Sequence, residues 1–130
     1  MAENLPTAAD VVVRATGLRF PEGPVALEDG SLLVVEVAGG CVTRVAPDGT
    51  TTRVAEVPGG PNGAALCGDG LLICNNGGFF DWHDVDGIVV PGPTPPSWTG
   101  GSIERVDLAT GEVRTVWIAS TNASRHPTTS

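Results

Sequence analysis

The sequence predicts an all-β fold of short antiparallel strands, and three observations support this prediction. First, the 130 residues include 18 Gly and 11 Pro, which are spread along the chain as turn residues. Second, the runs between these turns are short and rich in β-branched residues. Third, no stretch keeps apolar residues at helical spacing without a Gly or Pro inside it. The hydrophobic fraction of 41% is enough to build a core, so the chain is not compositionally disordered.

The expected strands follow one another in order, each ended by turn residues. Turns are expected at Ala38-Gly39-Gly40, Pro47-Asp48-Gly49, Gly68-Asp69-Gly70 and Ala109-Thr110-Gly111, where Asp and Gly suit backbone with positive φ. The strands are expected at 31–37, 41–46, 50–57, 63–66, 71–75, 102–108 and 112–119.

The chain repeats itself. Pro21-Glu22-Gly23 and the residues after it match Pro61-Asn62-Gly63 and its sequel at an offset of 40 residues. Later, 40–45 matches 101–106 at an offset of 61, because 77–100 is an insertion. A period near 40 with four short strands per unit is typical of a β-propeller blade. The sequence thus predicts two blades, at about 21–57 and 61–119.

Two blades cannot close a propeller, which usually has four to eight. The chain is therefore expected either to assemble into a ring through its open blade faces or to be part of a longer protein. Residues 1–17 are taken as an N-terminal segment and 18–119 as the two blades. The Pro and Gly content of the insertion, 77–100, predicts no regular structure there, while its Phe and Trp residues are expected to pack over another part of the molecule.

Composition excludes several classes of partner and compartment. The net charge is −8, and the 7 basic residues, all Arg, form no cluster, so neither nucleic acid nor an anionic membrane surface is an expected partner. No apolar run approaches the roughly 20 residues of a membrane span, and Met1–Asp10 does not resemble a secretory signal. Cys41, Cys67 and Cys74 lack metal-site spacing and are predicted to be small buried residues. Together these features predict a reducing, cytoplasmic location.

Four motifs taken together resemble the gluconolactonase family, which includes senescence marker protein 30 and luciferin-regenerating enzyme. They are Phe20-Pro21-Glu22-Gly23-Pro24, Leu33-Val34-Val35-Glu36, Pro58-Gly59-Gly60-Pro61-Asn62-Gly63 and Cys74-Asn75-Asn76-Gly77-Gly78-Phe79. Gly100–Asp107 also resembles bacterial members, and the resemblance runs from about Leu18 to Val116. It implies a six-bladed propeller, of which this chain supplies roughly the first two four-stranded blades.

The resemblance also implies a divalent metal at the mouth of the central channel and a sugar lactone as substrate. It assigns Glu22 as one metal ligand, while the family's Asn and Asp ligands have no counterpart in this chain. Asn62 and Asn76 are candidates for substrate contact or for support of the metal site. Oxygen ligands suit Ca²⁺ best, with Zn²⁺, Mg²⁺ and Mn²⁺ as the other candidates. The metal would polarise the lactone carbonyl for attack by water, and no general base is evident.

Plainer interpretations stay open. Glu22 could be an ordinary exposed carboxylate, Asn62 a turn residue, and Asn75 and Asn76 partners of local backbone groups. The acidic cluster Asp81, His83, Asp84 and Asp86 departs from the calcium-loop pattern and is interpreted as a solvated loop. At the level of function, the alternatives are a catalytically inactive propeller fragment with a binding or assembly role and a metal-independent relative resembling strictosidine synthase. The Glu of the Glu-Gly-Pro motif disfavours the latter.

The last residues, 120–130, do not continue the family pattern. Codons for Ala-Pro-Asn-Asp-Leu, read one base later, encode His-Pro-Thr-Thr-Ser, which stands here as His126–Ser130. The hypothesis that follows is a frameshifted tail.

Overall fold

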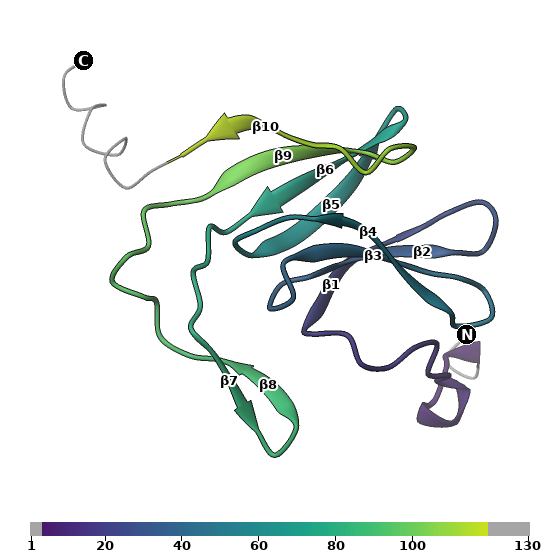
Figure 1. Ribbon diagram of the computed structural model, residues 1–130. Coiled ribbons are helices and arrows are strands. Elements are labelled where there is room, and N and C mark those ends of the chain that lie inside the picture. The colour runs from purple at the N-terminus through teal and green to yellow at the C-terminus, as the bar shows by residue number, and fades with distance from the viewer. Residues whose placement is uncertain (1–3, 120–130) are drawn as a thin grey trace.

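The computed structural model describes residues 4–119 and contains two four-stranded antiparallel sheets and a separate hairpin (Figure 1). We call the sheets blade 1, in the order β1-β2-β3-β4, and blade 2, in the order β10-β9-β6-β5. The strands are β1 Pro21–Ala26, β2 Leu32–Glu36, β3 Cys41–Val45, β4 Thr51–Glu56, β5 Pro61–Cys67, β6 Gly70–Asn75, β7 Trp82–Val85, β8 Ile88–Pro91, β9 Ser102–Asp107 and β10 Val113–Ile118. Residues Ala8–Asp10 form a short 3₁₀ turn ahead of the first strand.

The turns of blade 1 form for the reason that the sequence predicts. The carboxylate of Asp29 accepts a hydrogen bond from the backbone N–H of Ser31 at 2.9 Å, and Asp48 accepts one from Thr50 at 2.9 Å. Gly30 and Gly49 take φ values of +87° and +90°, which residues with a side chain rarely adopt. Each Asp-Gly pair therefore reverses the chain between neighbouring strands.

Blade 2 repeats this plan, although its second and third strands are far apart in sequence. β6 pairs with β9 in a continuous antiparallel register from Gly70 opposite Asp107 to Asn75 opposite Ser102. The two blades share an ion pair between the third strand and the first turn, which joins Arg44 to Asp29 in blade 1. In blade 2 it joins Arg105 to Asp69, at 2.7 Å. The insertion thus leaves the blade pattern intact.

The hydrophobic core lies between the blades, because side chains alternate between the two faces of each strand. Leu33 and Val35 of β2 point toward blade 2, whereas Leu71 and Ile73 of β6 point toward blade 1. The buried core residues are Leu33, Val35, Val42, Ala55, Val57, Leu71, Ile73 and Val106. The two blades therefore meet through one shared interface, in which one face of blade 1 packs against the facing side of blade 2, as stacked propeller blades do.

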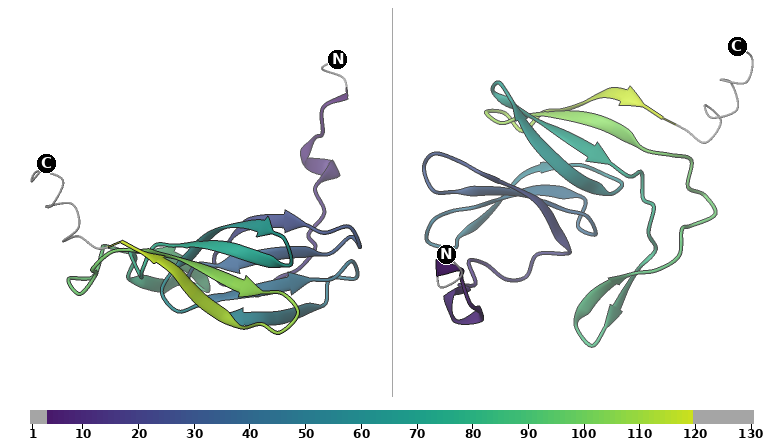
Figure 2. Two further views of the ribbon diagram at one scale, coloured as in Figure 1. Left: turned by 90° about the horizontal axis from the view of Figure 1, so that it is seen from above. Right: turned by 180° about the vertical axis from the view of Figure 1, so that it is seen from behind.

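The insertion is not wholly irregular, and this part of the sequence prediction is wrong. It contains the hairpin β7–β8, which stands apart from both sheets in Figures 1 and 2. Asp86 and Gly87 form its two-residue turn with φ values of +53° and +83°. Such Asp-Gly turns with two positive φ values favour hairpins, and this one is flanked by Val85 and by the β-branched run Ile88–Val90.

Aromatic side chains fasten the insertion to blade 1, as expected from the sequence. The rings of Phe20 and Trp82 have centroids 4.9 Å apart, and Phe80 lies 5.5 Å from Trp82. Phe79 contacts both Phe80 and Trp98 edge to face, each at 5.1 Å. The hairpin is thereby tied to the residue that precedes β1.

The prediction that all three cysteines are buried is correct only for Cys41. Cys67, at the end of β5, and Cys74, in β6, are exposed. Cys74 alternates with the buried Ile73 and so lies on the face of blade 2 that no further blade covers within residues 4–119. No helix in this same range is long and apolar enough to cross a membrane. The proposed frameshifted tail, 120–130, lies outside the described residues.

Candidate functional site at the start of the inner strands

The structure brings Glu22 and Asn62 to equivalent places on neighbouring inner strands. Each follows a proline at the start of β1 or β5, and both side chains belong to exposed residues. A methyl group built on Gly23 would lie 3.2 Å from Cα of Gly63, so the two strands approach each other closely beside these residues. The carboxylate and the amide therefore emerge at the same level of adjacent strands.

Asn76 uses its side chain and its carbonyl for hydrogen bonds to residues of the insertion. Its Oδ1 accepts hydrogen bonds from the backbone N–H groups of Gly78 at 2.9 Å and Phe79 at 3.0 Å. Its backbone carbonyl accepts one from the indole N–H of Trp98 at 2.7 Å. Its Nδ2 is buried without a hydrogen-bond partner. Asn76 thus shapes the first turn of the insertion, in agreement with the local interpretation of this residue.

Asn75 joins three segments next to the site. Its Oδ1 accepts hydrogen bonds from the N–H groups of Gly60 at 2.9 Å and Gly77 at 2.8 Å. Its Nδ2 donates to the carbonyl of Pro58 at 2.8 Å and to Glu104 at 2.9 Å. All hydrogen-bonding capacity of this buried amide is used, so the linker before Asn62, the start of the insertion and β9 are held together.

Glu36 occupies the matching position in blade 1, since it pairs with Pro21 as Asn75 pairs with Pro61. It is 6% exposed and accepts a hydrogen bond from the N–H of Arg19 at 2.8 Å and one from the hydroxyl of Thr43. Burial raises the pKa of Glu36, but these donors and the thiol of Cys41 outweigh burial and hold the pKa below its ordinary value. The carboxylate therefore stays ionised beneath the N-terminal segment.

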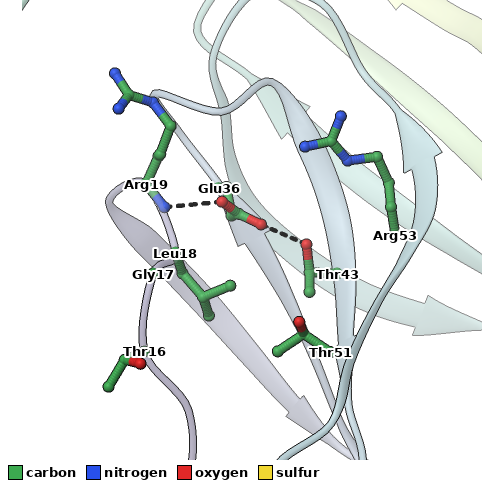
Figure 3. A pocket seen from close by; sticks show the side chains of 8 residues that line it. All are labelled: Thr16, Gly17, Leu18, Arg19, Glu36, Thr43, Thr51 and Arg53. Atoms are coloured by element: carbon green, nitrogen blue, oxygen red, sulfur yellow. Dashed lines mark hydrogen bonds between the residues drawn. The ribbon is translucent and has the colours of Figure 1, made fainter.

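A polar cavity of about 270 Å³ lies beside Glu36, between residues 16–19 and blade 1 (Figure 3). Three threonines and two arginines lie around it together with this carboxylate. Its lining residues are Thr16, Gly17, Leu18, Arg19, Glu36, Thr43, Thr51 and Arg53. Neither Glu22 nor Asn62 lines this cavity.

The side-chain oxygens of Glu22 and Asn62, on the inner strands, could form part of a metal site. Glu22 and Asn62 offer one carboxylate and one amide oxygen, which are hard ligands of the kind that Ca²⁺ and Mg²⁺ take. Within residues 4–119 no three His, Cys, Asp or Glu side chains gather into a metal-binding group. Two acidic residues of the insertion contact other side chains. Oδ2 of Asp81 lies 3.6 Å from Nε2 of His83, and Oδ2 of Asp84 lies 3.9 Å from Nη1 of Arg19. Any metal here would need further ligands in addition to Glu22 and Asn62.

Repeated four-stranded sheets packed face to face, with their inner strands side by side, define a propeller-blade protein. A model of the SMP-30/gluconolactonase/LRE-like region matches residues 20–129, and the chain therefore belongs to this family. The predicted all-β propeller class is confirmed. A search of curated proteins finds no match.

Solved structures also resemble this chain. The PQQ-bound aldose sugar dehydrogenase of Streptomyces coelicolor matches with 25% identity and a TM-score of 0.58, over 84% of this chain and 33% of its own. Virginiamycin B lyase of Staphylococcus aureus matches with 14% identity and a TM-score of 0.40, over 73% of this chain and 40% of its own. A streptogramin B lyase matches with 19% identity and a TM-score of 0.40, over 79% and 42%. The chain thus spans about a third of the length of the first of these proteins.

Proposed function

We propose that this chain provides two blades of a metal-dependent sugar-lactone hydrolase in which Glu22 is one metal ligand. The observation that carries the proposal is the juxtaposition of the exposed Glu22 and Asn62 on adjacent inner strands of a chain that belongs to the SMP-30/gluconolactonase family. The likeness to an aldose sugar dehydrogenase supports a sugar as the class of ligand. Three free cysteines support a reducing, cytoplasmic setting.

Each residue has a separate task in this proposal. Glu22 offers its carboxylate to a divalent cation, with Ca²⁺ preferred and Mg²⁺, Mn²⁺ or Zn²⁺ as alternatives. When bound, such a cation supplies Lewis acidity toward a lactone carbonyl. Asn62 can donate and accept hydrogen bonds with sugar hydroxyls from the neighbouring strand. Asn76 supports the site indirectly, because it fixes the turn that leads into the insertion.

A binding or assembly role without catalysis is the second candidate function. Exposed apolar side chains on blade 2 favour this binding or assembly role. Trp117 and Ile118, both in its outer strand β10, are 57% and 72% exposed. Large exposed apolar groups of this kind are typical of surfaces that contact another protein.

Manganese can locate the metal ligand in the chain itself. We expect Mn²⁺, added to ¹⁵N-labelled protein, to broaden the amide signals around Glu22 and Asn62, because a bound paramagnetic ion relaxes nearby nuclei. The Glu22→Gln variant should lose this local broadening, whereas Glu28→Gln, which removes a carboxylate at an exposed turn, should keep it. Adding glucono-δ-lactone with Mg²⁺ should then shift the Asn62 signals.

The opposite pattern would reject the proposal. If broadening centres on Asp81 and Asp84, or persists unchanged in Glu22→Gln, Glu22 is not a ligand. If Mn²⁺ binds at Glu22 but the lactone shifts no signal, the metal assignment survives and the substrate assignment fails.

A further inference from the structure

The residue before the first inner strand has a backbone conformation that is unfavourable for it. Phe20 takes a φ of +58°, in the left-handed region that favours glycine. Within residues 4–119 only Asp86, in the turn of the hairpin, also has a positive φ without being glycine. In blade 2 a glycine, Gly60, stands at the matching place before β5. Bulky residues persist in such conformations only where their surroundings hold them, so the ring of Phe20 calls for an explanation.

Hydrogen bonds tie the backbone around Phe20 to the end of β2. Its carbonyl accepts one from the N–H of Val37 at 3.0 Å. The N–H of the preceding residue, Arg19, donates to Oε1 of the buried Glu36 at 2.8 Å. None of these bonds involves the side chain of Phe20, whose ring contacts a different element.

That element is the hairpin of the insertion. The rings of Phe20 and Trp82, in β7, have centroids 4.9 Å apart. Nη1 of Arg19 lies 3.9 Å from Oδ2 of Asp84, two residues further along β7. Side chains two residues apart on a strand share a face, so one face of β7 lies against the residues before β1.

The contacts of Trp82 continue through other rings to the end of β6. Phe80 lies 5.5 Å from Trp82, and Phe79 lies 5.1 Å from Phe80. Phe79 also lies 5.1 Å from Trp98, whose indole N–H donates to the carbonyl of Asn76 at 2.7 Å. A continuous series of rings therefore joins the end of β6, in blade 2, to the residue before β1, in blade 1. We call the rings of Phe20, Phe79, Phe80, Trp82 and Trp98 the aromatic brace.

Glu22 follows Phe20 by two residues. Pro21, which lies between them, has a φ fixed by its own ring, so the direction of the chain at Phe20 determines where β1 starts. The pairing of β1 with β2 then shifts between Glu22 and Val25, and a β-bulge of this kind changes the direction in which a side chain points. The position of the Glu22 carboxylate therefore depends on how firmly Phe20 is held.

We propose that Phe20 and Trp82 are positioning residues, which hold Glu22 in place relative to Asn62 through the aromatic brace. The inference rests on the proposed function, because it assigns the brace a role toward a metal ligand. A carboxylate that is already held in its binding position loses less conformational freedom when it binds a cation. Neither ring needs to touch the metal or the substrate for this effect.

Substitutions of Trp82 test the brace in the ¹⁵N-labelled chain. Trp82→Leu removes the ring, and we expect the amide of Val37, which bonds the Phe20 carbonyl, to exchange its hydrogen about tenfold faster. Mn²⁺ should also bind about tenfold more weakly at Glu22, measured by the broadening of its amide signal. Trp82→Phe keeps a ring and should retain both properties, as should Ile88→Ala, which shortens an exposed side chain of the same hairpin.

Phe20→Gly separates the ring from the backbone. Glycine takes a φ of +58° without strain, so the chain should fold, and the amide of Ile73 in β6 should exchange as slowly as in the wild type. The affinity of Glu22 for Mn²⁺ should nevertheless fall about tenfold, because the link to Trp82 is lost. A residue needed only for folding would leave this affinity unchanged as long as the fold is kept.

Three results would overturn the proposal. They are wild-type exchange of Val37 in Trp82→Leu, wild-type Mn²⁺ affinity in Phe20→Gly, and an equal loss of either property in Ile88→Ala. If the wild-type chain shows no broadening at Glu22, the proposed function fails. The exchange of Val37 is measured without metal, and in that case it alone decides whether the brace holds the start of β1.

Discussion

At the scale of single residues, the buried polar groups at the ends of β2 and β6 organise the candidate site. Asn75 holds the linker before Asn62, and Glu36 holds the residues before Glu22. Buried hydrogen bonds of this kind contribute little net free energy when complete but cost much when one partner is removed. The side chains that position the inner strands are therefore more sensitive to substitution than the exposed residues they position.

Replacing Asn75 by Asp tests this difference. The substitution removes both donors of Nδ2, so it leaves the Pro58 carbonyl without a partner and places a carboxylate against Glu104. We expect a loss of about 2–3 kcal/mol in the free energy of unfolding, measured by urea denaturation. Asn62→Asp makes the same chemical change at an exposed residue and should alter the free energy of unfolding by less than about 0.5 kcal/mol. Equal losses would show that Asn75 is not the organising residue.

The sequence alone identifies Glu22 and Asn62 as candidates because each lies in a short local motif with its proline and glycine. It does not identify Glu104, which meets Asn75 across 29 residues of chain. That contact depends on β6 and β9 becoming neighbours after the insertion, and no local pattern encodes this pairing. The orientation of Asn76 is likewise set by the first turn of the insertion.

At the scale of elements, the insertion is anchored where it leaves and re-enters blade 2. Gly77 lies two residues after Asn75, the last residue of β6. It packs closely against the backbone of Gly100 and Gly101, which lead into β9. The strands of both blades follow from alternation and turn residues in the sequence. The sequence does not predict the hairpin β7–β8, because the Pro and Gly content of the whole insertion outweighs its one Asp-Gly turn signal.

Two adjacent glycines separate backbone strain from steric contact at this anchor. Gly77 and Gly78 have φ values of +77° and +84°, so alanine at either position incurs a similar backbone cost of about 1–2 kcal/mol. A methyl group on Gly77 would also collide with the carbonyl of Gly100, whereas one on Gly78 meets nothing within 4 Å. We expect Gly77→Ala to lower the free energy of unfolding by at least about 1 kcal/mol more than Gly78→Ala. Equal effects in urea denaturation would contradict the close approach.

At the scale of the whole molecule, the two blades differ in what covers their outer faces. The N-terminal segment covers part of blade 1, and Cys41 is fully buried beneath this face. The opposite face of blade 2 exposes Cys74. Burial is also the main cause that raises the pKa of the Cys41 thiol, which therefore remains protonated and unreactive.

Thiol labelling reports this asymmetry. In native protein, Ellman's reagent should react quickly with two thiols, Cys67 and Cys74, and with Cys41 only after denaturant is added. Cys74→Ser should remove one of the two fast phases, and Cys41→Ser should remove only the slow one. Slow labelling of Cys74 would mean that this face is covered in solution.

The repeated polar position has a consequence for how the chain finds its native pairing. Blade 1 carries its buried carboxylate on β2 and a threonine on β3, whereas blade 2 carries an amide on β6 and its carboxylate on β9. In proteins with similar repeats, a strand of one repeat can pair with the wrong repeat during folding. If β2 were to align with β9 in the register of β6, Glu36 and Glu104 would be buried side by side, and their mutual repulsion would disfavour the product. The different placement of carboxylate and amide in the two blades therefore favours pairing of each strand within its own blade.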